Sequence, residues 1–179
     1  MKKKTLWITE TAAMLALLIA LQWATKPLGQ LVTGSCVNAV LGVSALFCGL
    51  SSGLTVALLS PLFAYFLGIA PNLIAVPVIM AGNSLFVLLL TALQGKPVWK
   101  NIVSWLAAAA GKFAVMYALM VWVVCGVASD FLLAQGLLKA PMLKALPVTF
   151  GVAQLLTALI GGGIALLIVP VLKKALRKV

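Results

Sequence analysis

Lys112 is the only charged residue in the long apolar segment 101–128. A charged side chain at the centre of a bilayer costs at least about 2.5–3.5 kcal/mol, so Lys112 needs a counter-ion, a water-filled cavity or a path to the interface. Asp130 lies 18 residues further along, roughly 27 Å on a helix, too far for an ion pair. Glu10 reaches Lys112 only if the first and fifth apolar segments are neighbours. Lys112 is therefore either structural or faces an internal pocket.

Other polar and aromatic side chains are expected at depths that match such a pocket, given alternating helix directions. Asn38 lies near the outer end of the second apolar segment, and Asn83 lies near the middle of the fourth. Tyr117 and Trp122 belong to the outer half of the fifth segment, and Gln154 belongs to the outer half of the sixth. Buried amides require hydrogen bonds, so the set indicates either bonds between helices or a ligand cavity. The aromatic residues have packing and interface roles as alternatives.

The chain lacks the residue sets that most enzymes and metal sites use. It contains no His, and its only carboxylates are Glu10 and Asp130. Catalysis by paired acids or by His, and metal sites built on His, are therefore excluded within one chain. Cys36, Cys48 and Cys125 form no CxxC pair, which favours packing roles. With no GxxxxGK[ST] loop either, we expect no enzymatic activity, no metal and no cofactor.

Membrane helices must position these side chains. Apolar residues make up 64% of the 179 positions and charged residues 8%, whereas soluble domains have about 45–50% and about 25%. The formal net charge is +11, but the basic residues lie at the termini and in gaps between apolar segments. This distribution favours membrane topology over a nucleic-acid partner.

Six apolar segments predict an all-α integral membrane bundle of six transmembrane helices that forms a single domain, 1–179. The expected spans are about 6–24, 36–48, 53–69, 72–93, 101–128 and 147–172. Pro61 is expected to kink the third span. The polar stretch 25–35 is expected to be a loop.

Basic residues are unevenly divided between the two sides of such a bundle. Six spans place both termini on one side, together with the residues Lys2, Lys3, Lys4, Lys96, Lys100, Lys173, Lys174, Arg177 and Lys178. The other side holds only Lys26, Lys139 and Lys144. Because short cytoplasmic loops carry the excess of Lys and Arg, both termini are predicted to be cytoplasmic.

Small residues recur every four positions on the first span, at Ala12, Ala16 and Ala20. Such a stripe lets another helix approach closely in a membrane. On physical grounds the stripe packs either against another helix of the chain or against a partner protein, and internal packing is the commoner case.

Several of these stretches together resemble the substrate-specific S components of energy-coupling factor (ECF) transporters. They are the N-terminal Lys cluster, the alanine stripe, 34–39 (GSCVNA), 50–54 (LSSGL) and 59–62 (LSPL). The resemblance covers nearly the whole chain and implies a multi-pass protein of the bacterial cytoplasmic membrane. It also implies that the protein binds a vitamin or vitamin precursor near the outer face. A membrane T component and two cytoplasmic ATPases would supply the energy.

The resemblance assigns Ala12, Ala16 and Ala20 to the surface that meets the T component, and the loop 25–35 to a lid. It transfers no specific substrate contact. The metal-binding branch of the family is excluded because its His-containing site has no counterpart here.

Charge indicates which solutes such a pocket favours. Lys112 and several amides lie deep in the spans, whereas no acidic residue does, so a neutral or anionic organic molecule is favoured over a cation. Two alternatives remain open, a solitary carrier or channel without ATPases and a structural subunit of a membrane complex.

Overall fold

The computed structural model describes residues 2–70 and 72–176, most of which lie in helices. The elements are α1 (Lys2–Thr25), α2 (Gln30–Val43), α3 (Leu50–Phe66), α4 (Ala75–Ala92), α5 (Val98–Tyr117), α6 (Ser129–Ala134), α7 (Ala140–Thr149) and α8 (Val152–Ala175). Two π-helices, Ser44–Cys48 and Ala118–Val127, continue α2 and α5. The predicted all-α fold class is confirmed for the described residues.

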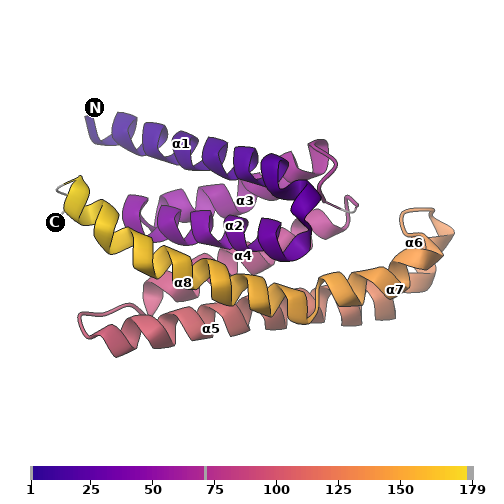
Figure 1. Cartoon of the computed structure of the whole chain (residues 1–179). Helices are drawn as coiled ribbons and strands as arrows, with labels where there is room; N and C mark the ends of the chain where they lie inside the picture. Colours follow the sequence, from indigo (N-terminus) through magenta and orange to yellow (C-terminus); the bar gives the residue numbers. More distant parts are fainter. Residues whose placement is uncertain (1, 71, 177–179) are drawn as a thin grey trace.

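The two termini lie at the same end of the bundle (Figure 1). The α4–α5 connection, which carries Lys96 and Lys100, is at this end too, whereas α6, α7 and the α1–α2 turn are at the opposite end. This arrangement agrees with the predicted separation of basic residues. Residues 177–179, which include Arg177 and Lys178, lie outside the described residues, as do the side chains of Lys2 and Lys3.

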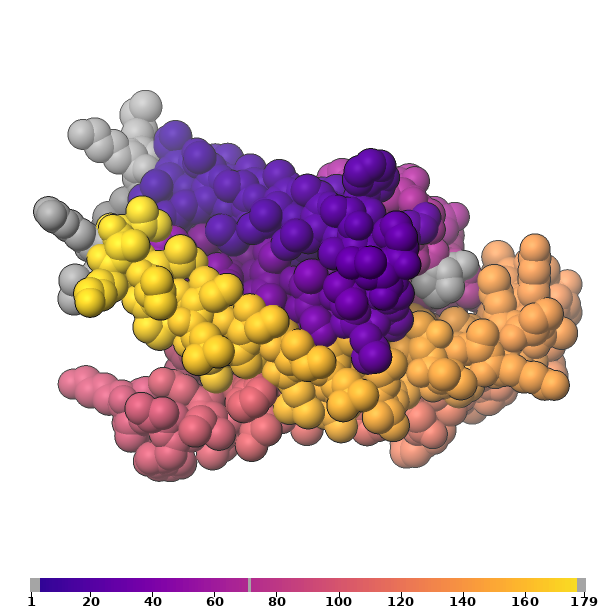
Figure 2. All heavy atoms as spheres, in the orientation of Figure 1, coloured from indigo at the N-terminus to yellow at the C-terminus, as the bar shows by residue number. Residues whose placement is uncertain are grey.

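The outer surface of the bundle is strongly apolar. Phe66 and Leu167 are 78% and 76% exposed, and α1, α2 and α8 together make up much of the face that Figure 2 shows. Five of the described helical segments are long and apolar enough to cross a membrane, and α3 is an apolar helix of 17 residues. At about 25 Å, α3 is at the lower limit for a span. Composition and helix length thus indicate a multi-pass membrane protein, in which five helices, or six with α3, could cross the membrane.

The segment 25–35, predicted to be a loop, is mostly helical. After α1 ends at Thr25 there is one short turn, and α2 begins at Gln30. The intervening Gly29 has a φ of +85°, a conformation that glycine adopts without strain. The prediction was wrong because polar residues in the first turns of α2 face the interior of the bundle, where Thr33 Oγ1 donates to the Thr25 carbonyl over 2.8 Å.

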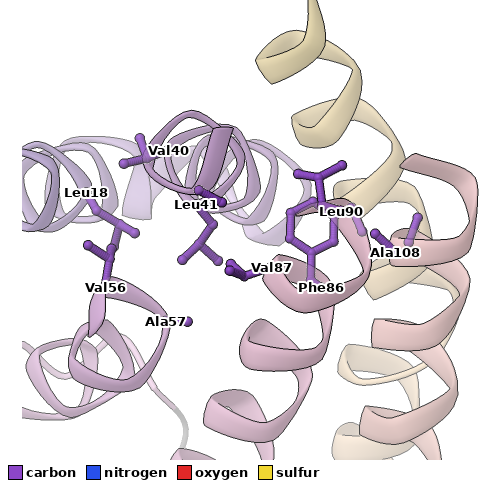
Figure 3. Close-up of a cluster of buried hydrophobic side chains, with 12 residues drawn as sticks. Leu18, Val40, Leu41, Val56, Ala57, Phe86, Val87, Leu90 and Ala108 are labelled. Atoms are coloured by element: carbon purple, nitrogen blue, oxygen red, sulfur yellow. The ribbon is translucent and has the colours of Figure 1, made fainter. Parts of the chain in front are cut away.

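One buried apolar cluster joins all six long helices. Figure 3 shows part of it, with Leu18, Leu41, Val56, Phe86 and Ala108 from α1 to α5. Ala158 of α8 belongs to the same cluster. Burial of these side chains fixes the long helices relative to one another, and therefore also fixes the polar residues that the same helices carry.

Glycine brings α2 and α8 into close contact. A Cβ atom on Gly161 would overlap the backbone oxygen of Ser35 and would lie 2.7 Å from the backbone nitrogen of Ala39. Only glycine fits where two helix backbones approach this closely. The contact places Asn38 of α2 beside α8.

Candidate functional site

A small polar cavity lies where the long helices meet. Its volume is about 80 Å³, enough for a few water molecules at about 30 Å³ each. Each long helix contributes a polar side chain to the lining, in chain order Gln22, Asn38, Ser60, Asn83, Lys112 and Gln154. The site therefore forms only when all six helices are packed.

Lys112 is the central charged group of the cavity. Its side chain is 2% exposed, and its Nζ donates to Asn38 Oδ1 over 2.6 Å and to Asn83 Oδ1 over 2.7 Å. The Nζ also lies 5.8 Å from the centre of the Phe86 ring. An ammonium group can only donate, so both amides must turn their oxygen atoms toward it. The structure thus brings Lys112, Asn38 and Asn83 together, as their predicted depths suggested.

The two amide nitrogens have different surroundings because Lys112 fixes both oxygens. Asn38 Nδ2 donates to Thr157 Oγ1 over 3.3 Å, and that hydroxyl donates to the Gln154 carbonyl over 3.1 Å. Asn83 Nδ2 is buried and has no hydrogen-bond partner in the part of the chain that the structure describes. Asn38 therefore ties α2 to α8, whereas Asn83 keeps two free donors.

Three of the polar residues in the lining carry a buried atom without a hydrogen-bond partner among the described residues. They are Gln22 Oε1, Ser60 Oγ and Asn83 Nδ2, on residues that are 7%, 1% and 1% exposed. A buried polar atom left unpaired costs about 1–3 kcal/mol. Unpaired groups that share one cavity point to a bound molecule, either water or a polar ligand, that completes their hydrogen bonds.

The charge of the cavity is not balanced by an acidic side chain in its described lining. The only two acids of the chain are Glu10, in the first half of α1, and Asp130, in α6. The remaining lining is largely apolar and includes Ile79, Met116 and Phe150. The arrangement combines a cationic, donor-rich polar part with apolar walls, which is typical of sites for small organic molecules.

The cavity lies toward the end of the bundle opposite the termini. Its lining includes Gln30 at the start of α2, Ile69 in the α3–α4 connection and Thr149 at the end of α7. The α1–α2 turn and α7 are at the end away from both termini (Figure 1). The cavity therefore faces the side that holds Lys26 and Lys139.

Gln154, Tyr117 and Trp122 complete the set of predicted site residues. Gln154 lines the cavity, and its Nε2 donates to the Thr149 carbonyl over 3.1 Å. Tyr117 instead lines a separate groove beside Phe113. Trp122 is 67% exposed, and its ring contacts that of Tyr117 edge-on. The structure thus places Asn38, Asn83, Lys112 and Gln154 in the cavity and Tyr117 and Trp122 outside it.

Two cavity residues, Gln22 and Ser60, were not among the predicted site residues. Gln22 is the only amide in the apolar segment 6–24, and this isolation is a signal that it faces other polar groups. Ser60 gives no such signal, since membrane serines commonly bond to their own helix backbone, as Ser44 Oγ does to the Val40 carbonyl.

The alanine stripe of α1 faces outward. Ala12, Ala16 and Ala20 are all exposed, whereas Thr11, Leu18 and Gln22 on the other face of α1 are buried. The stripe is therefore free of internal packing and presents a smooth strip along the outside of the bundle.

Comparison of the chain with protein-family models, curated proteins and solved structures finds no match. The chemistry of the cavity and the surface features around it therefore provide the evidence for function. Those features are the buried Lys112 with its two amides, the unpaired polar atoms and the exposed strip of small residues.

Proposed function

We propose that this chain is the substrate-binding membrane subunit of an ECF-type uptake transporter. In this role it captures a small neutral or anionic organic solute. The observation that carries the proposal is the cavity, in which the Lys112 ammonium group and three unpaired polar atoms converge from different helices. Bonds between helices alone would satisfy these atoms within the protein, whereas a solute site leaves some of them for the ligand.

The position of the cavity supports capture from outside the cell. The cavity lies toward the end opposite the termini, and the basic residues of the sequence favour cytoplasmic termini. With that orientation the solute enters from the outer face, near the α1–α2 turn. The proposed membrane is the bacterial cytoplasmic membrane, as the resemblance to S components implies.

The energy for uptake comes from other subunits in this proposal. The sequence has no nucleotide-binding loop of the GxxxxGK[ST] type. The exposed strip Ala12, Ala16 and Ala20 offers a close-contact surface for a second membrane protein, the T component, which would couple the chain to two ATPases. The protein itself carries out no chemical reaction.

The size of the cavity limits the solute. Sites for drug-sized ligands enclose about 300–1,000 Å³, whereas this cavity encloses about 80 Å³. The solute is therefore small, or the helices separate as it enters.

Purification of the tagged chain from its native membrane tests the proposal. A second membrane protein and a pair of ATPases should accompany the chain in fixed ratio. Purification of the chain alone, with bound solute, would instead identify a solitary carrier. Purification within a larger complex, with no solute bound under any condition, would identify a structural subunit.

A further inference from the structure

Among the described residues, two of the three unpaired polar atoms in the cavity lining can donate a hydrogen bond, Asn83 Nδ2 and Ser60 Oγ, whereas Gln22 Oε1 can only accept. An ammonium group has three N–H donors, and the structure accounts for two of those on Lys112 through Asn38 and Asn83. The Asn83 amide holds its oxygen toward Lys112, so its unpaired nitrogen must donate elsewhere. The Ser60 hydroxyl, also unpaired, lines the same cavity. A ligand that completes these bonds needs several acceptor atoms on one group.

The described lining of the cavity contains no acidic side chain that could balance a charge on Lys112. Lys112 is almost completely buried, and the described lining provides only amides, hydroxyls and apolar groups around it. An ammonium group without a counter-ion is unfavourable inside a membrane protein. A ligand anion would supply the missing charge as well as the acceptors.

We propose that the cavity binds the carboxylate of a small monocarboxylic acid. This inference rests on the proposed function and narrows its solute from a neutral or anionic molecule to an anion of one class. The carboxylate accepts from Lys112 Nζ, from Asn83 Nδ2 and from the Ser60 hydroxyl. Lys112 Nζ and the Asn83 amide are neighbours, since Nζ lies 2.7 Å from Asn83 Oδ1. A carboxylate has about four acceptor positions, enough for all three donors. The apolar body of the acid packs against Ile79, Met116 and Phe150.

Matched pairs of acid and amide test this inference. The purified full chain is titrated with acetate, propionate, butyrate, benzoate and nicotinate, and with the primary amide of each acid, at constant ionic strength. The acid and its amide have nearly the same shape, so a difference in affinity reports the charge of the head group. Hydrogen bonds to a charged group are stronger than those to a neutral one, so at least one acid should bind about ten-fold or more tightly than its amide.

Two serine variants compare the loss of a hydroxyl inside the cavity with the loss of a hydroxyl outside it. Ser60→Ala removes a cavity hydroxyl that has no partner in the described part of the chain, so it should weaken acid binding and leave the fold intact. Ser84→Ala removes another buried, unpaired hydroxyl that lies outside the cavity lining, and it should leave acid binding unchanged. Equal effects of the two substitutions would overturn the assignment of Ser60.

The outcomes distinguish this inference from the proposed function. Equal affinity for acids and amides would overturn the carboxylate inference and leave solute capture standing. Binding of no probe at all would overturn the inference as well, because a carboxylate site must register the smallest acids. Preference for an acid in a chain that purifies without ATPases would support the inference and contradict the ECF-type assignment.

Discussion

Two hydrogen bonds connect the Lys112 side chain of α5 to α2 and α4. Its Nζ donates to amides of α2 and α4, so the ammonium group, Asn38 and Asn83 form one buried unit. Neutral amides orient the ammonium group without neutralising it. A partner Asp or Glu would have balanced a charge on Lys112, whereas the amides leave that role open to an anionic ligand.

Lys112→Met is expected to weaken solute binding about ten-fold or more, because it removes a charged donor worth about 1.5–3 kcal/mol. The affinity for the retained solute, measured by titration on monodisperse protein, checks this prediction. Lys100→Met, on the same helix but exposed at the start of α5, serves as the control and should bind normally. Unchanged affinity in Lys112→Met would assign Lys112 a purely structural role.

Some residues of the cavity could be predicted from the sequence alone. Lys112, Asn38, Asn83 and Gln154 are rare residue types inside apolar segments, so their presence alone indicated a shared polar region. Tyr117 could not be placed, because it immediately precedes the π-helix Ala118–Val127. A π-helix changes which residues share a face, so the direction of nearby side chains does not follow from α-helical spacing.

At the scale of elements, the contact between α2 and α8 determines the position of Asn38. Gly161 lies against the backbone of α2, and Asn38 Nδ2 donates to Thr157 on α8. Small residues thus hold the two helices close enough for a direct polar bond. A wider separation would remove one of the two amides that orient Lys112.

Gly161→Ala is expected to destabilise the bundle by about 1–3 kcal/mol, the usual cost of overpacking, because α2 backbone atoms cannot move away from the added methyl group. Thermal unfolding in detergent measures the effect. The control is Gly126→Ala, where the new Cβ atom meets only one atom, at an ordinary distance of 3.5 Å. Equal loss of stability in both variants would show that the close contact is unimportant.

The alanine strip of α1 is the proposed contact surface for another membrane helix. Ala16→Leu is expected to abolish co-purification with the T component and the ATPases, because a bulky side chain prevents close approach of another helix. Solute capture by the isolated chain should remain. Ala110→Leu, at an exposed alanine of α5, provides the control and should leave the complex intact. Loss of solute binding together with the complex would indicate misfolding instead.

The sequence predicted which segments form helices better than it predicted the residues at which the helices begin and end. Long apolar runs identified the helices, since a membrane helix needs about 20 mostly apolar residues. The stretch 25–35 was misread because polarity usually marks a loop. Here Gln30, Thr33 and Gly34 line the internal cavity from the first turns of α2. Polar residues that face a cavity cannot be distinguished from loop residues by composition alone.

For the molecule as a whole, solute capture depends on which end of the bundle faces outward. Both termini and the α4–α5 connection are at one end, and the cavity is nearer the other. The excess of basic residues at the first end predicts that it is cytoplasmic. Uptake of an external solute requires this orientation.

Cysteine labelling on intact cells tests the orientation. In a variant without the three native cysteines, Lys139→Cys should react with a membrane-impermeant maleimide added outside. Lys96→Cys should react only after the membrane is permeabilised, because the α4–α5 connection is predicted to be cytoplasmic. The reverse pattern would place the cavity on the cytoplasmic side and contradict solute capture from outside.

Native mass spectrometry of the freshly purified chain shows whether the cavity around Lys112 holds a solute. We expect the wild-type protein to carry one small molecule per chain, and Lys112→Met, folded to the same degree, to lose most of it. Wild-type protein that carries no small molecule even after incubation with a metabolite extract would contradict solute binding in this cavity, as would equal occupancy in the two proteins.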